Sequence, residues 1–67
     1  MNMQPVSSDR MVAVGWADDT LFVEFHDGAL YAYDGVSSQE HQSFMSAPSL
    51  GSELSRLDKR HPYRRIR

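Results

Sequence analysis

The chain has 67 residues, of which 40% are hydrophobic, and seven Lys or Arg residues stand against nine Asp or Glu residues, for a formal net charge of −2. A chain of this length forms one domain, residues 1–67, and has no room for a two-domain enzyme. Because it contains no cysteine, disulfide scaffolds, thiol catalysis and cysteine-based zinc sites are excluded.

The beginning of the chain carries no targeting or membrane signal. No apolar stretch approaches the roughly 18 residues that a membrane span needs. Residues 1–5 also lack a charged segment followed by an apolar one. We therefore expect a cytoplasmic protein without a membrane partner, in which residues 1–5 form an N-terminal arm.

Three short runs of β-favouring residues predict strands at Met11–Trp16, Leu21–Phe25 and Ala29–Tyr33. Asp18-Asp19 and Asp27-Gly28 separate these runs, and both pairs suit two-residue hairpin loops because Asp and Gly tolerate positive φ. The pattern predicts a three-stranded antiparallel meander.

The two predicted loops fix which residues pair across the strands, and paired residues lie on the same side of a sheet. The first loop pairs Trp16 with Leu21, Val14 with Val23 and Val12 with Phe25. The second pairs Glu24 with Tyr31 and Phe22 with Tyr33. One face then collects the apolar residues Val12, Val14, Trp16, Leu21, Val23, Phe25, Leu30 and Ala32. The other face would bring Phe22, Tyr31 and Tyr33 together.

Two helices are predicted after the strands. Ser37 and Glu40 form a capping box, and the helix that follows, residues 37–47, is the main helix, which would cover the apolar face with His41, Phe44 and Met45. A second short helix is predicted at Ser52–Arg60, with Leu54 and Leu57 on its buried side. His61-Pro62 ends it, and residues 63–67 form an extended tail that could pair with a sheet edge. The fold class is α+β.

The charges are divided unevenly along the chain. Residues 1–55 contain eight acidic residues and one basic residue, Arg10, whereas residues 56–67 contain six basic residues and one acidic residue, Asp58. The basic C-terminal tail, residues 61–67, could hold phosphates. The alternative is that it docks on the acidic body of the same molecule.

The three aromatic residues of the second face indicate a surface for RNA. Bases of single-stranded nucleic acid stack on aromatic rings of a sheet, and nearby arginines hold the phosphates. The predicted RNA-binding residues are Phe22, Tyr31, Tyr33, Tyr63, Arg64, Arg65 and Arg67. The alternative is structural: the C-terminal segment folds over this face, and Leu54, Leu57 and Ile66 bury the rings.

Catalytic, metal and cofactor sites are not expected. His26, His41 and His61 lack the spacing of metal ligands. The sequence also has neither a nucleophile elbow nor a Gly-rich phosphate loop. We therefore predict a protein that is not an enzyme.

The ordered motifs along the chain resemble the KTSC domain, a small bacterial family found at the C-terminus of some lysyl-tRNA synthetases. The matching segments are Pro5-Val6-Ser7-Ser8, Val14-Gly15-Trp16, Leu21 to Gly28, Tyr31-Ala32-Tyr33, Gly35-Val36, Ser49-Leu50-Gly51-Ser52 and Tyr63-Arg64-Arg65-Ile66. Tyr31 and Tyr33 correspond to the family's central YxY motif. The family usually has a tyrosine where Trp16 stands and an aromatic residue near Leu54 and Leu57.

The resemblance implies a shared fold and, through the synthetases, RNA binding. It marks Tyr31 and Tyr33 as central positions and Gly51, Tyr63 and Arg64 as secondary ones. The sequence thus predicts a binding module for RNA, either tRNA-like or single-stranded. The alternatives are a protein-interaction or homo-oligomerisation module, and a binder of nucleotides or other small ligands.

Overall fold

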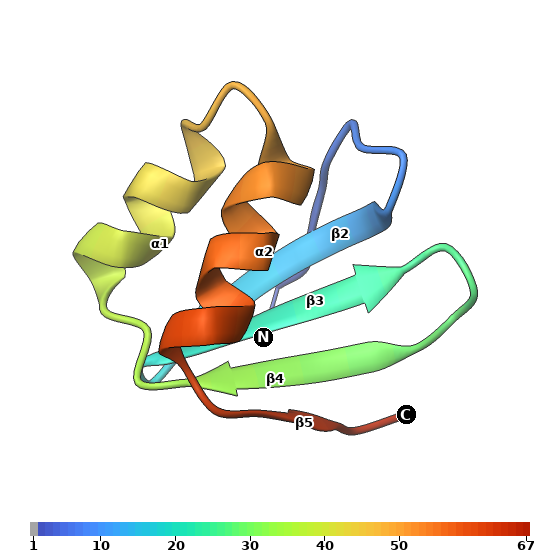
Figure 1. Ribbon diagram of the computed structural model, residues 1–67. Coiled ribbons are helices and arrows are strands. Elements are labelled where there is room, and N and C mark those ends of the chain that lie inside the picture. Colours follow the sequence, from blue (N-terminus) through green and yellow to red (C-terminus); the bar gives the residue numbers. More distant parts are fainter. Residues whose placement is uncertain (1) are drawn as a thin grey trace.

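The computed structural model describes residues 2–67, which form a sheet packed by two helices on one face (Figure 1). The elements in chain order are β1 (Gln4–Pro5), β2 (Met11–Ala17), β3 (Thr20–Phe25), β4 (Leu30–Asp34), α1 (Ser38–Met45), α2 (Leu50–Arg60) and β5 (Tyr63–Arg65). The strands lie in chain order, and all neighbours are antiparallel. The α+β prediction is confirmed, but the sheet of the described residues has five strands instead of three.

The two additional strands lie at the sheet edges. The extended tail pairs with β4 through Tyr63–Arg65, as the sequence predicted. No strand was predicted in the N-terminal arm, residues 1–5, whereas Gln4 and Pro5 pair with β2. Met1, the first residue of that arm, lies outside the described residues.

The first hairpin has the predicted loop and register. Asp18 and Asp19 both have positive φ, 50° and 58°, as a two-residue type I′ loop requires, and Trp16 pairs with Leu21. The register shifts farther from the loop, where Met11 instead of Val12 pairs with Phe25. Val12 is therefore the extra residue of a β-bulge. It is 37% exposed, while Met11 enters the core.

The second hairpin differs from the prediction by one residue. Its loop has three residues, 26–28, because the Phe25 N–H donates to the Ala29 carbonyl and the Gly28 N–H donates to the Phe25 carbonyl, both at 2.9 Å. Gly28 has φ of +91°, which fits a type I turn followed by a left-handed residue. Tyr31 consequently pairs with Val23 and Tyr33 with Leu21.

A shift of one residue turns every side chain of a strand to the other face. The predicted pairs Glu24 with Tyr31 and Phe22 with Tyr33 are therefore wrong. Tyr31 and Tyr33 lie on the helix-covered face, and Leu30 and Ala32 lie on the open face, opposite to the predicted arrangement.

Both helices begin at serine caps. The Ser37 hydroxyl accepts a hydrogen bond from the Glu40 N–H at 3.1 Å, which confirms the predicted start of α1. Ser49 caps α2 in the same way through the Ser52 N–H at 3.3 Å, so α2 begins two residues before its predicted start. With 11 residues against 8 in α1, α2 is the longer helix, and the expectation of a single main helix is wrong.

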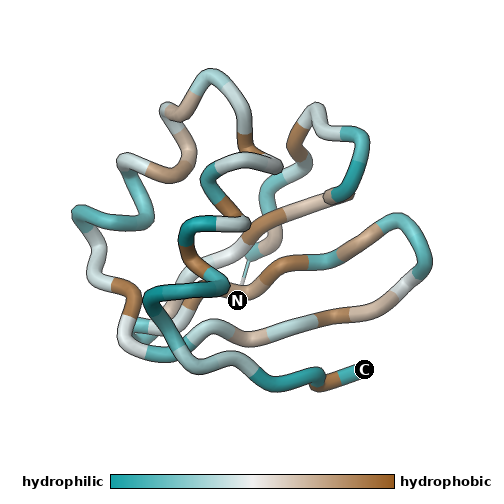
Figure 2. Tube along the Cα trace, in the orientation of Figure 1, coloured by the Kyte–Doolittle hydropathy of each residue, from teal (hydrophilic) through white to brown (hydrophobic). Residues whose placement is uncertain are grey.

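The core lies between the helices and the covered face of the sheet. Hydrophobic segments run along the central strands, whereas the end of α2 and β5 are largely hydrophilic (Figure 2). The core residues are Met11, Val14, Leu21, Val23, Tyr33, Val36, Phe44, Leu54 and Leu57. Helix α2 supplies Leu54 and Leu57 and α1 supplies Phe44, so both helices pack against the sheet.

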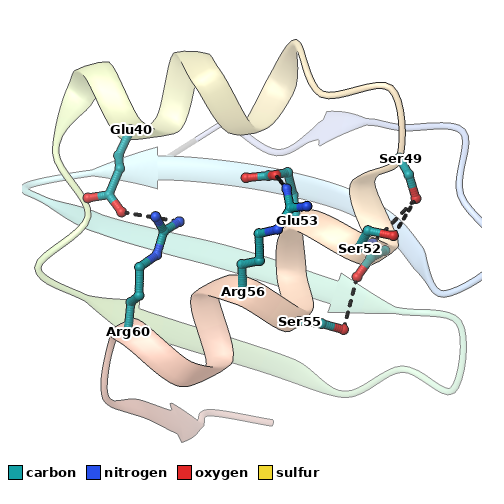
Figure 3. A network of polar contacts seen from close by, with 8 residues as sticks. Glu40, Ser49, Ser52, Glu53, Ser55, Arg56 and Arg60 are labelled. Atoms are coloured by element: carbon teal, nitrogen blue, oxygen red, sulfur yellow. Dashed lines mark hydrogen bonds and ion pairs between the residues drawn. The ribbon is translucent and has the colours of Figure 1, made fainter.

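Polar contacts join the two helices at the edge of this core. Figure 3 shows Glu40 of α1 beside Arg60 of α2, and these side chains lie 3.7 Å apart. The Nε2 atom of His61 is 2.7 Å from the same Glu40 carboxylate. The hydrogen bond with His61, and then the electrostatic effects of His61 and Arg60, lower the pKa of Glu40 despite the opposing effect of desolvation. Within residues 2–67, no helix is long and apolar enough to cross a membrane.

Candidate functional site

The three rings predicted to share a face are separated in the structure. Phe22 lies on the open face between Gly15 and Ala32, its partners on the neighbouring strands. Tyr31 and Tyr33 lie on the covered face because of the longer second loop. The predicted site of Phe22, Tyr31 and Tyr33 is therefore wrong as a set.

A different group of four rings forms on the covered face, and we call it the aromatic cluster: Phe25, Tyr31, Tyr33 and Tyr63. The ring centroids of Phe25 and Tyr31 lie 5.5 Å apart in an edge-to-face arrangement. Tyr63 of β5 lies 6.0 Å from Tyr31 and 5.2 Å from Tyr33. Such offset and edge contacts are favourable for aromatic rings, so β5 completes the cluster.

Tyr33 forms the buried floor of the cluster. It is 3% exposed and belongs to the core with Leu54 and Leu57. Its hydroxyl donates to Oδ1 of Asp58 on α2 at 2.8 Å. Burial and, second, this hydrogen bond raise the pKa of Tyr33 well above the usual value for tyrosine. The alternative in which the C-terminal segment buries the rings is thus correct for Tyr33. Ile66 does not take part, because it is 49% exposed.

The rings border a cleft of about 460 Å³ beside α2, which we call the aromatic cleft. It lies toward the end of the sheet with the β3–β4 loop, which extends past α2 (Figure 1). The residues that line it are Arg10, Phe25, His26, Asp27, Ala29, Tyr31, Tyr33, Asp58, Tyr63 and Arg65. Tyr63 is 52% exposed, so a ligand can reach its ring from solvent.

Most arginines of the C-terminal segment pair with acidic residues of the body. Arg64 contacts Asp34 at 2.6 Å and Arg67 contacts Glu24 at 3.2 Å. The alternative in which the tail docks on the acidic body is therefore correct for these two arginines, which belong to the predicted RNA-binding set.

Arg65 and Arg10 differ from these arginines. Arg65 lies opposite Tyr31 in the sheet, and its Nε donates to the main-chain oxygen of Arg67 at 3.0 Å. Arg10 donates to the Gly51 carbonyl at 3.2 Å and to the Ser55 hydroxyl at 3.3 Å. Within residues 2–67, neither guanidinium forms an ion pair with an Asp or Glu side chain. Both line the aromatic cleft and keep a positive charge there.

A second cleft, of about 630 Å³, lies on the other side of Arg10. Its lining includes Ser7, Ser8, Ser49, Ser52 and Ser55 but no aromatic residue. Ser55 already accepts a bond from Arg10 and donates one to the Gly51 carbonyl at 3.2 Å. The aromatic cleft therefore offers the broader range of contacts to a planar, charged ligand.

The histidines have structural contacts. His26 lies 3.0 Å from the Ser8 carbonyl, and the ring of His41 stacks on Trp16 at 5.9 Å. His61 bonds Glu40. Among the described residues, no three His, Asp or Glu side chains are placed to hold a metal ion.

Comparison with known proteins identifies the family. The KTSC domain matches residues 7–63. The chain belongs to the KTSC domain family. The crystal structure of a KTSC domain protein from Yersinia pestis is 36% identical, covers 98% of this chain and 97% of its own, and superposes with a TM-score of 0.88. A search of curated proteins finds no match.

The positions that the resemblance to the KTSC domain marked lie in different environments. Tyr31 and Tyr63 line the aromatic cleft and Tyr33 lies beneath it. Gly51 accepts a hydrogen bond from Arg10, while Arg64 lies on the open face. Sequence reasoning missed Phe25, Arg10 and Asp58 as cleft residues. Gly28 could have indicated the three-residue loop, and with it the face on which Tyr31 lies, because a glycine at the third loop position is typical of that loop.

Proposed function

We propose that this KTSC domain is a small non-enzymatic binding module whose ligand is RNA, tRNA-like or single-stranded, and that the RNA binds in the aromatic cleft. The observation that carries the proposal is the position of Arg65, a guanidinium without an Asp or Glu ion-pair partner within residues 2–67, beside the accessible rings of Tyr31 and Tyr63. A ring and a nearby cation are the two contacts that a nucleotide needs.

The energies of these contacts favour the cleft as the RNA site. Stacking of a base on an aromatic side chain contributes about 1–3 kcal/mol. The overall charge of −2 opposes binding of a polyanion, but Arg10 and Arg65 place two guanidinium groups at the cleft, which also contains the carboxylates of Asp27 and Asp58. The ligand therefore approaches from the side of the rings, with its phosphates toward these arginines.

The proposed interface is smaller than the one predicted from the sequence. Phe22 is on the open face, and Arg64 and Arg67 are paired with Asp34 and Glu24. We leave these three residues out of the interface and retain Tyr31, Tyr63 and Arg65. An interface of this size accepts one or two bases.

Titration of fluorescein-labelled tRNA and of a short single-stranded RNA at two salt concentrations tests the proposal. We expect affinity to fall with salt, with a logarithmic slope of about −0.7 for each phosphate held. Tyr63→Ala should weaken binding by about 1–3 kcal/mol, the value of one stacked base. Phe22→Ala, a ring on the open face, is the matched control and should bind as the unmodified protein does. No binding at low salt would refute the proposal.

A second candidate function is protein interaction or homo-oligomerisation through β5. This strand is one of the two exposed edges of the sheet, and the adjacent Ile66 is 49% exposed. Edge strands can pair with another chain, although short, charged edges resist it. This function predicts a molecular mass that rises with concentration in light scattering and no response to RNA.

A further inference from the structure

We infer that the aromatic cleft prefers guanine and that Asp58 is the residue that selects this base. The inference rests on the proposed function and names the base that the site accepts best. Asp58 is well placed for the role because it is a partly buried carboxylate of α2 on the wall of a cleft that rings and two arginines also line.

The carboxylate of Asp58 is held in place and still has acceptor capacity. Its Oδ1 accepts from the Tyr33 hydroxyl at 2.8 Å. No other side-chain hydrogen bond or ion pair among residues 2–67 uses this carboxylate. No side-chain oxygen of the described residues is both buried and without a partner, so Oδ2 is accessible to solvent. A ligand in the cleft can therefore donate to it.

The edge of guanine complements such a carboxylate. Guanine presents two adjacent donors, N1–H and the N2 amino group, on its Watson–Crick edge. Adenine and cytosine each present one amino group next to an unprotonated ring nitrogen, which a carboxylate repels. Uracil presents a single N–H between two carbonyls. Single-stranded RNA exposes these edges to side chains, so only guanine can make two parallel hydrogen bonds to Asp58.

Rings and a carboxylate can also bind an organic cation. The lining holds two arginines, Arg10 and Arg65, as well as two aspartates, Asp27 and Asp58, so an organic cation would meet two guanidinium groups beside the carboxylates. A nucleotide uses both kinds of group, the carboxylate for its base and the arginines for its phosphate.

Tyr33 acts here as a positioning residue. It is buried and donates its hydroxyl proton to one oxygen of Asp58. This bond fixes the rotation of the carboxylate and leaves Oδ2 and the second lone pair of Oδ1 for the two guanine donors. Asp58→Asn can retain the bond to Tyr33 through its amide oxygen, but it then presents an NH₂ group, a donor, toward the guanine donors.

Fluorescence anisotropy with three RNAs, UUGUUU, UUAUUU and UUIUUU, where I is inosine, tests the preference. Two hydrogen bonds to a base edge discriminate by about 1–3 kcal/mol, so we expect UUGUUU to bind about tenfold more tightly than UUAUUU. Inosine lacks the N2 amino group and should bind with intermediate affinity. Asp58→Asn should reduce the difference between the guanine and adenine RNAs to twofold or less.

Asp27→Asn is the matched control. Asp27 lines the same cleft, and its Oδ1 accepts from the Ala29 N–H at 3.0 Å, a bond that asparagine can keep. The substitution removes the same charge from the same cleft, so it should leave the preference unchanged while Asp58→Asn abolishes it. Thermal melting confirms that both variants are folded. Equal binding of the three RNAs, or equal effects of the two substitutions, would overturn the preference alone; no binding to any of them would overturn the proposed function as well.

Discussion

The two faces of the sheet use the same kinds of residue in different ways. On the open face, Phe22 stands alone and Arg64 and Arg67 are paired with Asp34 and Glu24. On the covered face, four rings form a cluster, and Arg65 and Arg10 lie beside it without an Asp or Glu ion-pair partner among residues 2–67. The arginines of the open face are thus paired directly with carboxylates, whereas those of the cleft share its lining with Asp27 and Asp58 without contacting them.

Strand β5 illustrates the difference over two neighbouring residues. Arg64 and Arg65 point to opposite faces because side chains alternate along a strand, and they pair with Ala32 and Tyr31 respectively. A count of basic residues in the C-terminal segment does not distinguish them. The face to which each arginine points decides whether it neutralises the body or remains available for a ligand.

Deletion of Ala29 should have the largest effect. With the loop of residues 26–28 kept, Leu30 instead of Ala29 would lie opposite Phe25, and the β4 side chains would turn to the opposite faces. Tyr33 would leave the core and Ala32 would enter it, so we expect loss of cooperative folding by circular dichroism. His26→Gly keeps the length of the hairpin and should remain folded. A folded deletion variant would show that the loop does not fix the register.

Tyr33→Ala and Phe22→Ala compare one ring on each face. Removal of a buried aromatic side chain costs about 3–5 kcal/mol, and Tyr33→Ala also takes a hydrogen bond from Asp58. Phe22 is partly exposed, and its replacement should cost about 1 kcal/mol. Urea denaturation measures both values. Equal losses would contradict the assignment of Tyr33 to the core.

Glu40→Gln and Asp34→Asn compare the ion pairs of Glu40 with the end of α2 and the ion pair of Asp34 with Arg64 on the open face. Because the pKa of Glu40 is lowered from its usual 4.5, its contribution is full above that pH and is lost as the pH falls through the folded-state pKa. We expect Glu40→Gln to cost about 0.5–1 kcal/mol at pH 6 and progressively less as the pH falls below 4.5. Asp34→Asn, in an exposed pair, should cost under about 0.5 kcal/mol. Thermal melts across pH test this, and a pH-independent loss for Glu40→Gln would contradict it.

Much of the fold is predictable from the sequence because the relevant signals are local. Strand positions, the Asp18-Asp19 turn, the Ser37 cap and the Pro62 stop all depend on residues within a few positions of one another. These elements form as expected. The family resemblance is also confirmed, since it depends on an ordered set of motifs along the chain.

Which side chains lie on each face of the sheet could not be predicted in the same way, because this depends on whether His26 belongs to the second loop. Asp27-Gly28 suits both a two-residue loop and the end of a three-residue loop, and the choice decides where Tyr31 and Tyr33 point. The bulge at Val12 has a similar effect on Met11. The roles of Arg10 and Asp58 arise from contacts over 41 and 25 positions respectively, which no local pattern reveals.

The most direct test compares Arg65→Gln with Arg64→Gln in binding of single-stranded RNA at low salt. The two substitutions remove the same charge from adjacent residues on opposite faces of β5. We predict that Arg65→Gln weakens binding severalfold and reduces the salt slope by about 0.7, whereas Arg64→Gln leaves both unchanged. Equal losses, or a larger loss for Arg64→Gln, would contradict an RNA site in the aromatic cleft.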